Sequence, residues 1–530
     1  MTATPDITAP RRVTTRDWVG LSVLALACLM YIMDLTVLHL AVPAMSADLQ
    51  PTSSQLLWII DIYGFMVAGF LITMGTLGDR IGRRRLLLIG AAAFGVASLL
   101  CAFSTSAEML ILSRALLGIA GATLAPSTLS LLFSMFEDPA QRSRAIAIWV
   151  SAFSAGSAIG PLAGGFVLEH FWWGAVFLLA IPVVLLLLVL GPIVLPEYRD
   201  PNAGRLDLPS AFMSLVAVLA VVFGLKQIAQ DGLDPVAIGS MLLGIAVGAI
   251  WVRRQLRLDD PMIDLRLLRG RSFSAALSVN FLTVFVMVGY FLFVAQYLQL
   301  VLGMSPLEAG AWSVPSAIAF IIASNSVPWL QRHFGPERII ATGFVLTAIG
   351  LAILATASAS MDGLVPVVVA SIIISFGLGP IFGLTTELVV GSAPPEKAGA
   401  ASGISETATE LGGSLGIAIL GSIGVAMYRS TMLVAAPAGV PADILGAARD
   451  TLGGAVDAAS QLPQALGDAL LALARDSFVS SMQTVAIVSA VLAVGAAVWA
   501  FIAIRRPSSD DEAPTDASWS SAKPGLASEA

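Results

Sequence analysis

The sequence predicts an all-helical protein that crosses a membrane many times. Of its 530 residues, 57% are hydrophobic and only 12% are charged, and the mean hydropathy is +0.88. Soluble proteins carry about 25% charged residues, so a soluble fold of this size would lack the charge to cover its surface. The composition therefore argues against a soluble enzyme or a secreted disulfide scaffold. The net charge of −7 argues against a nucleic-acid partner.

Fourteen apolar segments are each long enough to form a membrane-spanning helix, which needs about 20 residues. In chain order, the expected spans are residues 18–41, 54–76, 86–104, 109–132, 145–168, 173–195, 208–227, 235–252, 272–299, 307–330, 338–357, 364–390, 402–428 and 477–503. The first starts too late and runs too long for a cleaved secretory signal, so we expect it to be retained.

The basic residues gather on one side of the membrane under this assignment. Of the 28 Lys and Arg residues, 23 fall in the terminal segments and in the alternate loops on that side. Because cytoplasmic loops carry an excess of Lys and Arg, we expect this side and both termini to be cytoplasmic. The other five are Lys226, Arg429, Arg449 and Arg475 on the opposite side, and Arg114 inside a span.

The order of the spans predicts two six-helix halves with a helix pair inserted between them. We expect a cytoplasmic N-terminus at 1–17, a first half at 18–200, the inserted pair at 201–255, a second half at 256–505 and a disordered cytoplasmic tail at 506–530. An offset of 252 residues matches Arg80 to Arg332, Gly160 to Gly412 and Gly164 to Gly416. Such internal matches are expected where a transporter is built from repeated halves.

The segment 429–476 interrupts the second half on the outer side. Its pattern predicts two short amphipathic helices, at about 441–459 and 463–475. Interfacial helices usually carry Lys and Arg on the polar face, whereas this polar face is acidic, so we expect the hairpin to pack on the protein's own outer mouth. A solvated linker is the alternative. The expected acidic stripe comprises Asp443, Asp450 and Asp457, seven residues apart.

Two glycine-rich motifs stand out. The turn after the second span holds Gly75, Gly78, Asp79, Arg80, Gly82, Arg83 and Arg84, and the fifth span holds Gly156, Gly160, Pro161, Gly164 and Gly165. Glycines permit a tight turn and close helix approach. An acid at a helix C-terminus is disfavoured by the helix dipole unless cationic partners or the N-terminus of another helix compensate it. A simple basic anchor would explain the arginines but not Asp79. The second motif alone would also fit a plain packing seam.

Together these motifs resemble those of the major facilitator superfamily, and specifically its fourteen-helix family of proton-coupled drug antiporters. The first is similar to the family's loop 2–3 signature and the second to its antiporter signature. Residues 34–43, Arg114 with Gly118, and residues 261–273 also match, and the resemblance covers roughly 15–505. This sequence departs from the family at His39, usually Asn, and at Glu406 and Glu410, often uncharged or basic. These departures concern the substrate range.

Charged side chains inside spans are the strongest candidates for transport chemistry, because each costs on the order of 3 kcal/mol on insertion scales. A carboxylate there holds a proton or neutralises a cation, and this competition is the physical basis of antiport. We expect Asp34, paired with Arg114, to couple transport to protons. Asp61 is the second candidate. Glu406 and Glu410, on one helix face, are proton or cation sites in the other half. For each carboxylate, a structural hydrogen bond is the alternative.

Several aromatic residues are candidates for lining a substrate cavity, since ring faces attract lipophilic cations. They are Tyr31, Trp58, Phe65 and Trp149, together with His39, which can also relay protons near neutral pH. Packing, or a structural hydrogen bond for His39, is the alternative role.

The sequence carries no phosphate-binding loop and no catalytic constellation, so we expect no enzyme activity and no cofactor. Cys28 and Cys101 lie in apolar runs and the three histidines are scattered, so no metal site is expected. The resemblance implies proton-driven export of lipophilic, often cationic drugs from a bacterial cytoplasm across the plasma membrane, by a monomer. A proton-coupled uptake permease is the first alternative, and a polytopic membrane enzyme or a channel is the second.

Overall fold

The computed structural model describes residues 13–504, apart from positions 137, 200–206, 259, 260, 262, 264, 393–397 and 438. In this part of the chain all regular structure is helical, as the sequence predicts. The predicted tail 506–530 and the basic residues Arg11, Arg12, Arg205 and Lys397 lie outside the described residues.

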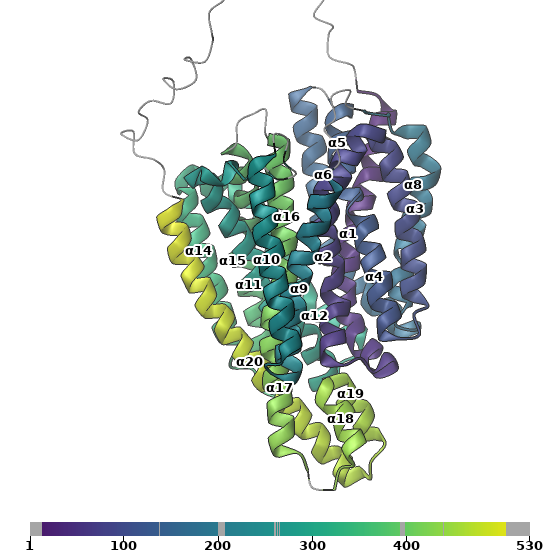
Figure 1. Ribbon diagram of the computed structural model, residues 1–530, viewed down its shortest axis with the longest axis vertical. Coiled ribbons are helices and arrows are strands. Elements are labelled where there is room, and N and C mark those ends of the chain that lie inside the picture. Colours follow the sequence, from purple (N-terminus) through teal and green to yellow (C-terminus); the bar gives the residue numbers. More distant parts are fainter. Residues whose placement is uncertain are drawn as a thin grey trace, which may run out of the picture.

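The helices form an elongated bundle with two groups side by side (Figure 1). The first group comprises α1 (Thr15–Leu49), α2 (Ser53–Ile81), α3 (Arg83–Ala102), α4 (Ala107–Gly121), α5 (Leu124–Met135), α6 (Pro139–His170), α7 (Ala175–Leu178) and α8 (Ala180–Val194). The inserted pair is α9 (Leu208–Asp231) and α10 (Pro235–Arg257).

The second group follows the inserted pair. It comprises η1 (Leu267–Arg269), α11 (Arg271–Gln296), η2 (Tyr297–Val301), α12 (Pro306–Asn325), α13 (Val327–His333), α14 (Pro336–Leu354), η3 (Met361–Gly363), α15 (Leu364–Gly391), α16 (Ala398–Gly416), η5 (Ile417–Gly421), α17 (Ser422–Ala435), α18 (Ala442–Asp450), α19 (Leu452–Ser460) and α20 (Gln464–Ala503).

Among the described residues, thirteen helical segments are long and apolar enough to cross a membrane, against the fourteen spans predicted. The remaining predicted span, 145–168, lies in α6, which has 32 residues and packs along α1 and α12. At 1.5 Å per residue, α6 is about 48 Å long, enough to cross the hydrocarbon core. Some predicted spans are interrupted, for example between α4 and α5, where Pro126 has no N–H to donate to the carbonyl of Ala122.

Local sequence explains where several helices begin. A cap residue precedes a proline within the first two positions of α6, α9, α10 and α12, where the missing N–H costs nothing. Each cap side chain accepts a hydrogen bond from the backbone N–H three residues on. The caps are Asp138, Asp207, Asp234 and Ser305, with distances of 3.0, 3.2, 2.6 and 3.2 Å.

Glycine contacts relate the two groups of helices. A Cβ on Gly160 of α6 would lie 2.1 Å from an atom of α1, and one on Gly412 of α16 would lie 2.6 Å from the carbonyl oxygen of Phe281 in α11. Gly164 and Gly416 repeat these close approaches one turn further along. The offset of 252 residues therefore relates two equivalent helix contacts, α6 on α1 and α16 on α11.

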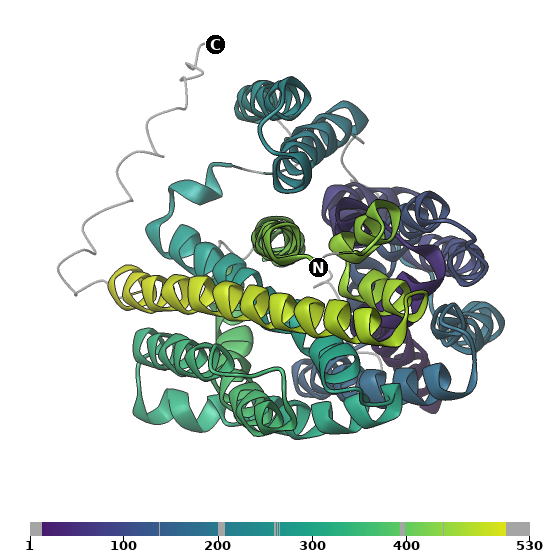
Figure 2. The ribbon, with the colours of Figure 1, turned by 90° about the horizontal axis from the view of Figure 1, so that it is seen from below.

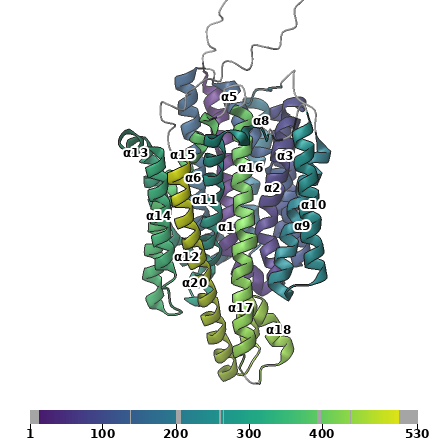
Figure 3. The same ribbon diagram turned by 60° about the vertical axis from the view of Figure 1, so that its left-hand side comes forward.

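The inserted pair lies at the edge of the bundle, where α9 contacts α2 and α17 (Figures 2 and 3). The start of α9 and the end of α10 are joined by two hydrogen bonds. Arg254 Nη2 donates to Asp207 Oδ1 at 2.9 Å, and Gln255 Nε2 donates to Ser210 Oγ at 2.7 Å. Partial burial raises the pKa of Asp207, but hydrogen bonds from Ser210 and Arg254 and the charge of Arg254 lower it below its ordinary value overall. These contacts fasten α9 and α10 to each other.

Helices α18 and α19 and the adjacent ends of α17 and α20 project from one end of the bundle, which we call the hairpin end (Figures 1 and 3). The opposite end, where Arg83, Arg142 and Arg254 lie, we call the basic end. The prediction of one continuous helix over 441–459 is wrong, because the structure has two helices, α18 and α19, in this segment. Thr451 between them is extended (φ −144°, ψ 155°), and its side chain caps α19 by accepting a hydrogen bond from the Gly454 N–H. The predicted helix 463–475 is the first part of the 40-residue α20.

The break at Thr451 also ends the predicted acidic stripe. Asp450 terminates α18, Asp457 lies on α19, and the side chain of Asp443 lies outside the described residues. The expectation that the hairpin packs on the protein itself is confirmed. A Cβ on Gly453 of α19 would lie 2.7 Å from Ser46 of α1, and Gln50 Nε2 donates to Asp457 Oδ2 at 2.8 Å.

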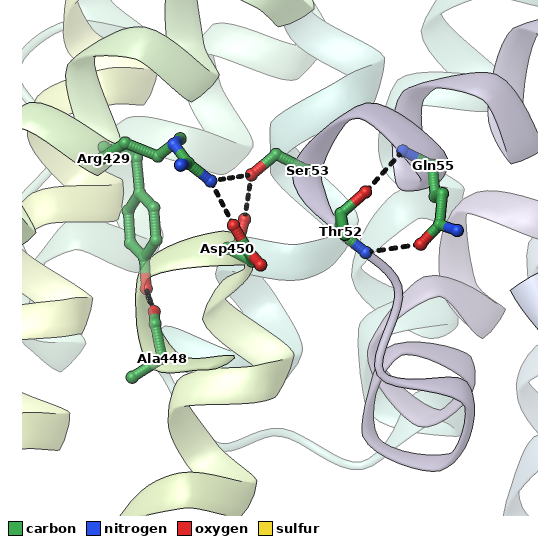
Figure 4. Close-up of polar contacts among 7 residues, drawn as sticks. Thr52, Ser53, Gln55, Arg429, Ala448 and Asp450 are labelled. Carbon is green, nitrogen blue, oxygen red and sulfur yellow. Dashed lines mark hydrogen bonds and ion pairs between the residues drawn. The ribbon is translucent and has the colours of Figure 1, made fainter. Parts of the chain in front are cut away.

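Asp450 joins the hairpin to both groups of helices (Figure 4). Its carbonyl accepts a hydrogen bond from Ser53 Oγ at 2.6 Å, and its carboxylate forms an ion pair with Arg429 of α17. Ser53 begins α2, whose capping box is formed by Thr52 and Gln55. Through its carbonyl and its carboxylate, Asp450 therefore ties α2 and α17 together at the hairpin end.

We expect Gly412→Ala to lower the free energy of unfolding by about 1–3 kcal/mol, the usual effect of overpacking, because the new Cβ would meet backbone rather than a movable side chain. The thermal unfolding midpoint of the full-length protein in detergent measures this. Gly495→Ala in α20, with nothing within 4 Å of its Cβ, is the matched control and is expected to unfold like the unaltered protein. Equal midpoints for both variants would contradict the close α16–α11 contact.

Candidate functional site

Asp34 of α1 faces Arg114 of α4 in the interior of the bundle. Arg114 Nη1 lies 3.5 Å from Asp34 Oδ2, and the two side chains are 0% and 6% exposed. Arg114 Nε also donates to the carbonyl of Ile59 at 2.6 Å, and its guanidinium lies 5.3 Å from the ring centroid of Tyr63. The predicted pairing of Asp34 with Arg114 is confirmed.

The Asp34 side chain borders a small cavity between α1 and the α7–α8 segment. The lining residues are Met30, Met33, Asp34, Val37, Val176, Leu179 and Ala180. In such apolar surroundings the charge–charge attraction is stronger than in water. This cavity lies within the first group of helices and not between the two groups.

A chain of contacts leads from this ion pair to the second group of helices. The rings of Tyr63 and Tyr31 lie 6.0 Å apart, and Tyr31 Oη donates to Glu410 Oε1 of α16 at 2.5 Å. Helix α16 lies close to α2 at this level because Gly64 of α2 has no side chain. A Cβ on Gly64 would lie 2.4 Å from Ser414 Oγ of α16. The tyrosines therefore connect Asp34 and Arg114 to a carboxylate across the boundary between the groups.

Glu406 lies one turn before Glu410 and is partly exposed. Glu406 and Trp149 of α6 both lie near the Cys28 thiol of α1. Cys28 Sγ is 3.7 Å from Thr128 Oγ1. Two of the predicted residues, Glu406 and Trp149, are thus brought together at α1.

His39 lies on α1 beyond Asp34, toward the hairpin end, and its ring centroid is 6.4 Å from that of Phe291 in α11. It also lies within electrostatic reach of Arg114. Its ring therefore packs between the two groups of helices, on the hairpin-end side of the Asp34–Arg114 pair.

Asp61 has a partner that the sequence reasoning placed elsewhere. Lys226 was counted with the basic residues of the outer side, but its side chain is buried against α2 from α9, and the residue is 1% exposed. Its Nζ is 2.9 Å from Asp61 Oδ1 and 2.8 Å from Oδ2, and 3.7 Å from the centroid of the Trp58 ring. Phe65 packs beside Trp58, with ring centroids 6.3 Å apart. Lys226, to which the sequence assigned no role, is thus the buried counter-ion of Asp61.

The first glycine-rich motif forms the turn between α2 and α3 at the basic end. Arg83 Nε donates to Asp79 Oδ1 at 2.7 Å, which supplies the cationic partner that the sequence required. Gly82 has φ +112°, a conformation suited to glycine, and a Cβ there would meet Glu197 at 2.4 Å. Glu197 Oε1 accepts from the backbone N–H of Arg84 at 3.1 Å, so its carboxylate caps the start of α3.

The remaining members of this turn have simpler roles. Gly75 approaches α5, since a Cβ on it would lie 4.0 Å from Pro126. The carbonyl of Arg80 accepts a hydrogen bond from Arg199 Nε at 2.5 Å. Both contacts tie the α2–α3 turn to neighbouring parts of the first group.

The second motif lies where α6 meets both α1 and α12. A Cβ on Gly156 would lie 2.8 Å from the Leu29 carbonyl, and one on Gly165 would lie 2.7 Å from the Pro306 carbonyl. Reciprocally, a Cβ on Gly310 of α12 would lie 2.4 Å from the carbonyl of Pro161. The motif therefore lets backbone pack on backbone across the two groups of helices.

Sequence reasoning missed Lys226, Tyr63 and Glu197 as partners. For Lys226 a signal was present: it falls within the predicted span 208–227, and a charge inside a span is a functional candidate by default. For Tyr63 and Glu197 no such signal exists, because their importance depends on which distant residues they meet. No group of three or more His, Cys, Asp or Glu side chains in the described ranges is arranged to hold a metal ion.

Comparison with known proteins identifies the fold family. The sequence pattern of the Major Facilitator Superfamily matches residues 24–417. The chain belongs to this superfamily. It is therefore a multi-pass membrane protein, and the resemblance predicted from the motifs is confirmed.

The similar sequences include proteins named for drug efflux or resistance. Multidrug efflux pump LfrA of Mycolicibacterium smegmatis is 44% identical over 504 residues, which cover 95% of this chain and 99% of that protein. Methyl viologen resistance protein SmvA of Salmonella typhimurium is 35% identical, covering 91% and 97%. The tetracenomycin C resistance and export protein of Streptomyces glaucescens is 32% identical, covering 94% of each.

Solved structures agree on the fold. A bacterial homologue of the human lysosomal transporter Spinster, in an inward-facing and unoccupied conformation, superposes with a TM-score of 0.64. The match covers 94% of this chain and all of that chain, at 17% identity. The predicted major-facilitator architecture is thereby confirmed.

We expect Arg114→Met to lower the free energy of unfolding by about 3–5 kcal/mol, because it leaves Asp34 as an uncompensated buried charge. Asp34→Asn combined with Arg114→Met removes both charges and is expected to recover much of that loss. Thermal unfolding in detergent measures both variants. Arg332→Met, which changes an exposed arginine, is the control. A double variant no more stable than Arg114→Met would contradict the importance of the pair.

Proposed function

We propose that this protein exports lipophilic, often cationic small molecules from a bacterial cytoplasm in exchange for protons, working as a monomer by alternating access. The observation that carries the proposal is the buried Asp34–Arg114 pair and its connection, through two tyrosines, to Glu410 in the other group of helices. Relatives over nearly the whole chain are named as efflux, export or resistance proteins.

Protonation of Asp34 would remove the negative charge that faces Arg114. Arg114 would then be held mainly by its hydrogen bond to the carbonyl of Ile59 in α2 and by the ring of Tyr63. Since Tyr63 neighbours Tyr31, whose hydroxyl bonds Glu410 across the two groups, a change at Asp34 acts on the contact that links the groups. This arrangement supports coupling between proton binding and the relative movement of the helix groups.

The substrate would compete with the proton for the same carboxylates. Glu410 and Glu406 lie on one face of α16, close to Tyr31 and Cys28 of α1. A carboxylate paired with a bound organic cation has a lower affinity for a proton, and a protonated carboxylate attracts the cation less. Entry of a proton from outside therefore favours release of the drug.

The basic end is assigned to the cytoplasm and the hairpin end to the outside. The assignment rests on the excess of Lys and Arg in the loops of one side. Arg83 lies at the start of α3, Arg142 near the start of α6 and Arg254 near the end of α10, and we take these helix ends to be cytoplasmic. Helix α1 begins and α20 ends toward the basic end (Figure 1).

We expect Asp34→Asn to abolish pH-driven efflux while Asp34→Glu, which keeps a titratable group, retains part of it. Proteoliposomes loaded with ethidium and subjected to a pH gradient, with and without a protonophore, provide the measurement. Asp362→Asn, an exposed carboxylate in η3, is the matched control and is expected to transport normally. Undiminished, gradient-dependent efflux by Asp34→Asn would overturn the assignment. Faster accumulation of ethidium in cells containing the protein would favour an uptake permease instead.

The proposed orientation predicts opposite labelling of cysteines placed at the two ends. The native Cys28 and Cys101 are buried, so maleimide labelling reports on the introduced cysteine alone. A membrane-impermeant maleimide added to intact cells is expected to label Ser460→Cys at the hairpin end and to leave Arg257→Cys at the basic end unlabelled until the cells are opened. The reverse pattern would invert the topology.

A further inference from the structure

Lys226 is a buried charge that the proposed transport cycle does not use. It belongs to α9, which with α10 lies at the edge of the bundle (Figures 2 and 3), yet its side chain has no exposed surface. The side chain extends from this peripheral helix toward Asp61 of α2. An intramembrane charge of this kind is rare and is usually functional.

The surroundings of the Lys226 ammonium are those of a site for an organic cation. Both oxygens of the Asp61 carboxylate lie within 2.9 Å of Nζ, and the Trp58 ring centroid lies 3.7 Å away. A carboxylate supplies the opposite charge, and the face of an indole attracts cations through its quadrupole. These two features are the ones by which proteins recognise quaternary ammonium and other lipophilic cations.

The walls around this ion pair are apolar. Phe65 of α2, Val222 of α9 and Ala418 of η5 form a buried cluster, against which Trp58 and Leu415 pack. Trp58 is partly exposed, whereas Asp61 is buried, so the indole forms the outer wall. These apolar side chains suit the hydrocarbon part of a lipophilic cation whose charge is directed at Asp61.

Lys226 lies close to one end of its helix. It is five residues before the end of α9 at Asp231, a rise of about 7.5 Å along the helix. Lysine side chains extend along apolar surface toward the membrane interface. The hairpin end of α9 is therefore the direction in which this ammonium would withdraw from Asp61.

We propose that Asp61 and Trp58 form a binding site for one organic monocation, and that Lys226 is a tethered cation that fills this site until a substrate replaces its ammonium. This inference rests on the proposed function and names the substrate chemistry of one site within it. The exchange leaves the charge of the buried site unchanged, because one cation takes the place of another.

A purely structural tie between α9 and α2 explains the lysine less well. Apolar side chains of similar size usually hold buried helices together as well as an ion pair does, because burying two charges has a large desolvation cost. The Asp61–Lys226 pair is therefore a weak device for attachment. It is a good device for keeping a cation site occupied and neutral when no substrate is present.

The first experiment measures equilibrium binding of tetraphenylphosphonium to the purified full-length protein in detergent. A site that is mostly occupied by an internal competitor binds with an apparent affinity reduced by the fraction of time it is free. We expect Lys226→Met to bind the cation about tenfold more tightly, and Asp61→Asn combined with Lys226→Met to lose that gain. Binding of the neutral dye Nile red is the control and is expected to be equal in both variants.

Two results of this experiment would overturn the proposal. One is unchanged affinity of Lys226→Met, and the other is equal affinity of Lys226→Met and the double variant. Thermal unfolding of each variant establishes that it is folded. This binding assay uses no proton gradient, so its outcome does not depend on whether Asp34→Asn loses pH-driven transport. The proposed cation site and the proposed proton coupling can therefore be disproved independently.

The second experiment uses the unaltered protein, so it decides the question even if Lys226→Met does not fold. The chain has only three lysines, Lys226, Lys397 and Lys523, and reductive methylation followed by peptide mass spectrometry reports on each. We expect saturating tetraphenylphosphonium to increase methylation of Lys226 several-fold and to leave the other two unchanged. Methylation of Lys226 that stays low while the cation is bound would overturn the proposal.

Discussion

The structure depends on the cost of placing charge in a medium of low dielectric constant. An ionised side chain in the interior of a membrane bundle must have a partner of opposite charge. Helix α2 lies at the centre of this requirement. The carbonyl of Ile59 holds Arg114 beside Asp34, and Asp61 holds Lys226 of the inserted pair. Two buried ion pairs thus lie where α1, α4 and α9 meet α2.

Close helix approach makes these pairs possible. Gly64 lets α16 come near enough to α2 for Glu410 to reach Tyr31, and the glycines of α6 bring it against α1 and α12. At the hairpin end, Asp450 adds a polar connection between α2 and α17 (Figure 4). At the basic end, the α2–α3 turn is closed by Arg83 and Glu197. Each end of the bundle therefore has its own polar ties, and the middle has paired charges.

Much of this arrangement was predictable because membranes impose strong rules on sequence. Helix count and order follow from the length of apolar segments, and the pairing of Asp34 with Arg114 follows from the need to neutralise a charge inside a span. Helix-dipole reasoning required that Asp79 be compensated, and the structure shows that Arg83 does so. The errors lie where a prediction depended on a local break or on depth. A single extended residue, Thr451, divides the predicted hairpin helix, and Lys226 points inward from the last turns of α9.

Span length, basic loops and glycine motifs are local features of the chain, so they are sufficient to predict a polytopic helical membrane protein of the Major Facilitator Superfamily. Which buried charges meet is a different question, because it depends on the packing of distant helices. Asp61 and Lys226 are 165 residues apart, and Tyr31 and Glu410 are 379 apart. Periodicity and composition carry no information on contacts at such separations. They arise when helices pack, and the low dielectric constant of the interior then selects the arrangement in which each charge has its partner.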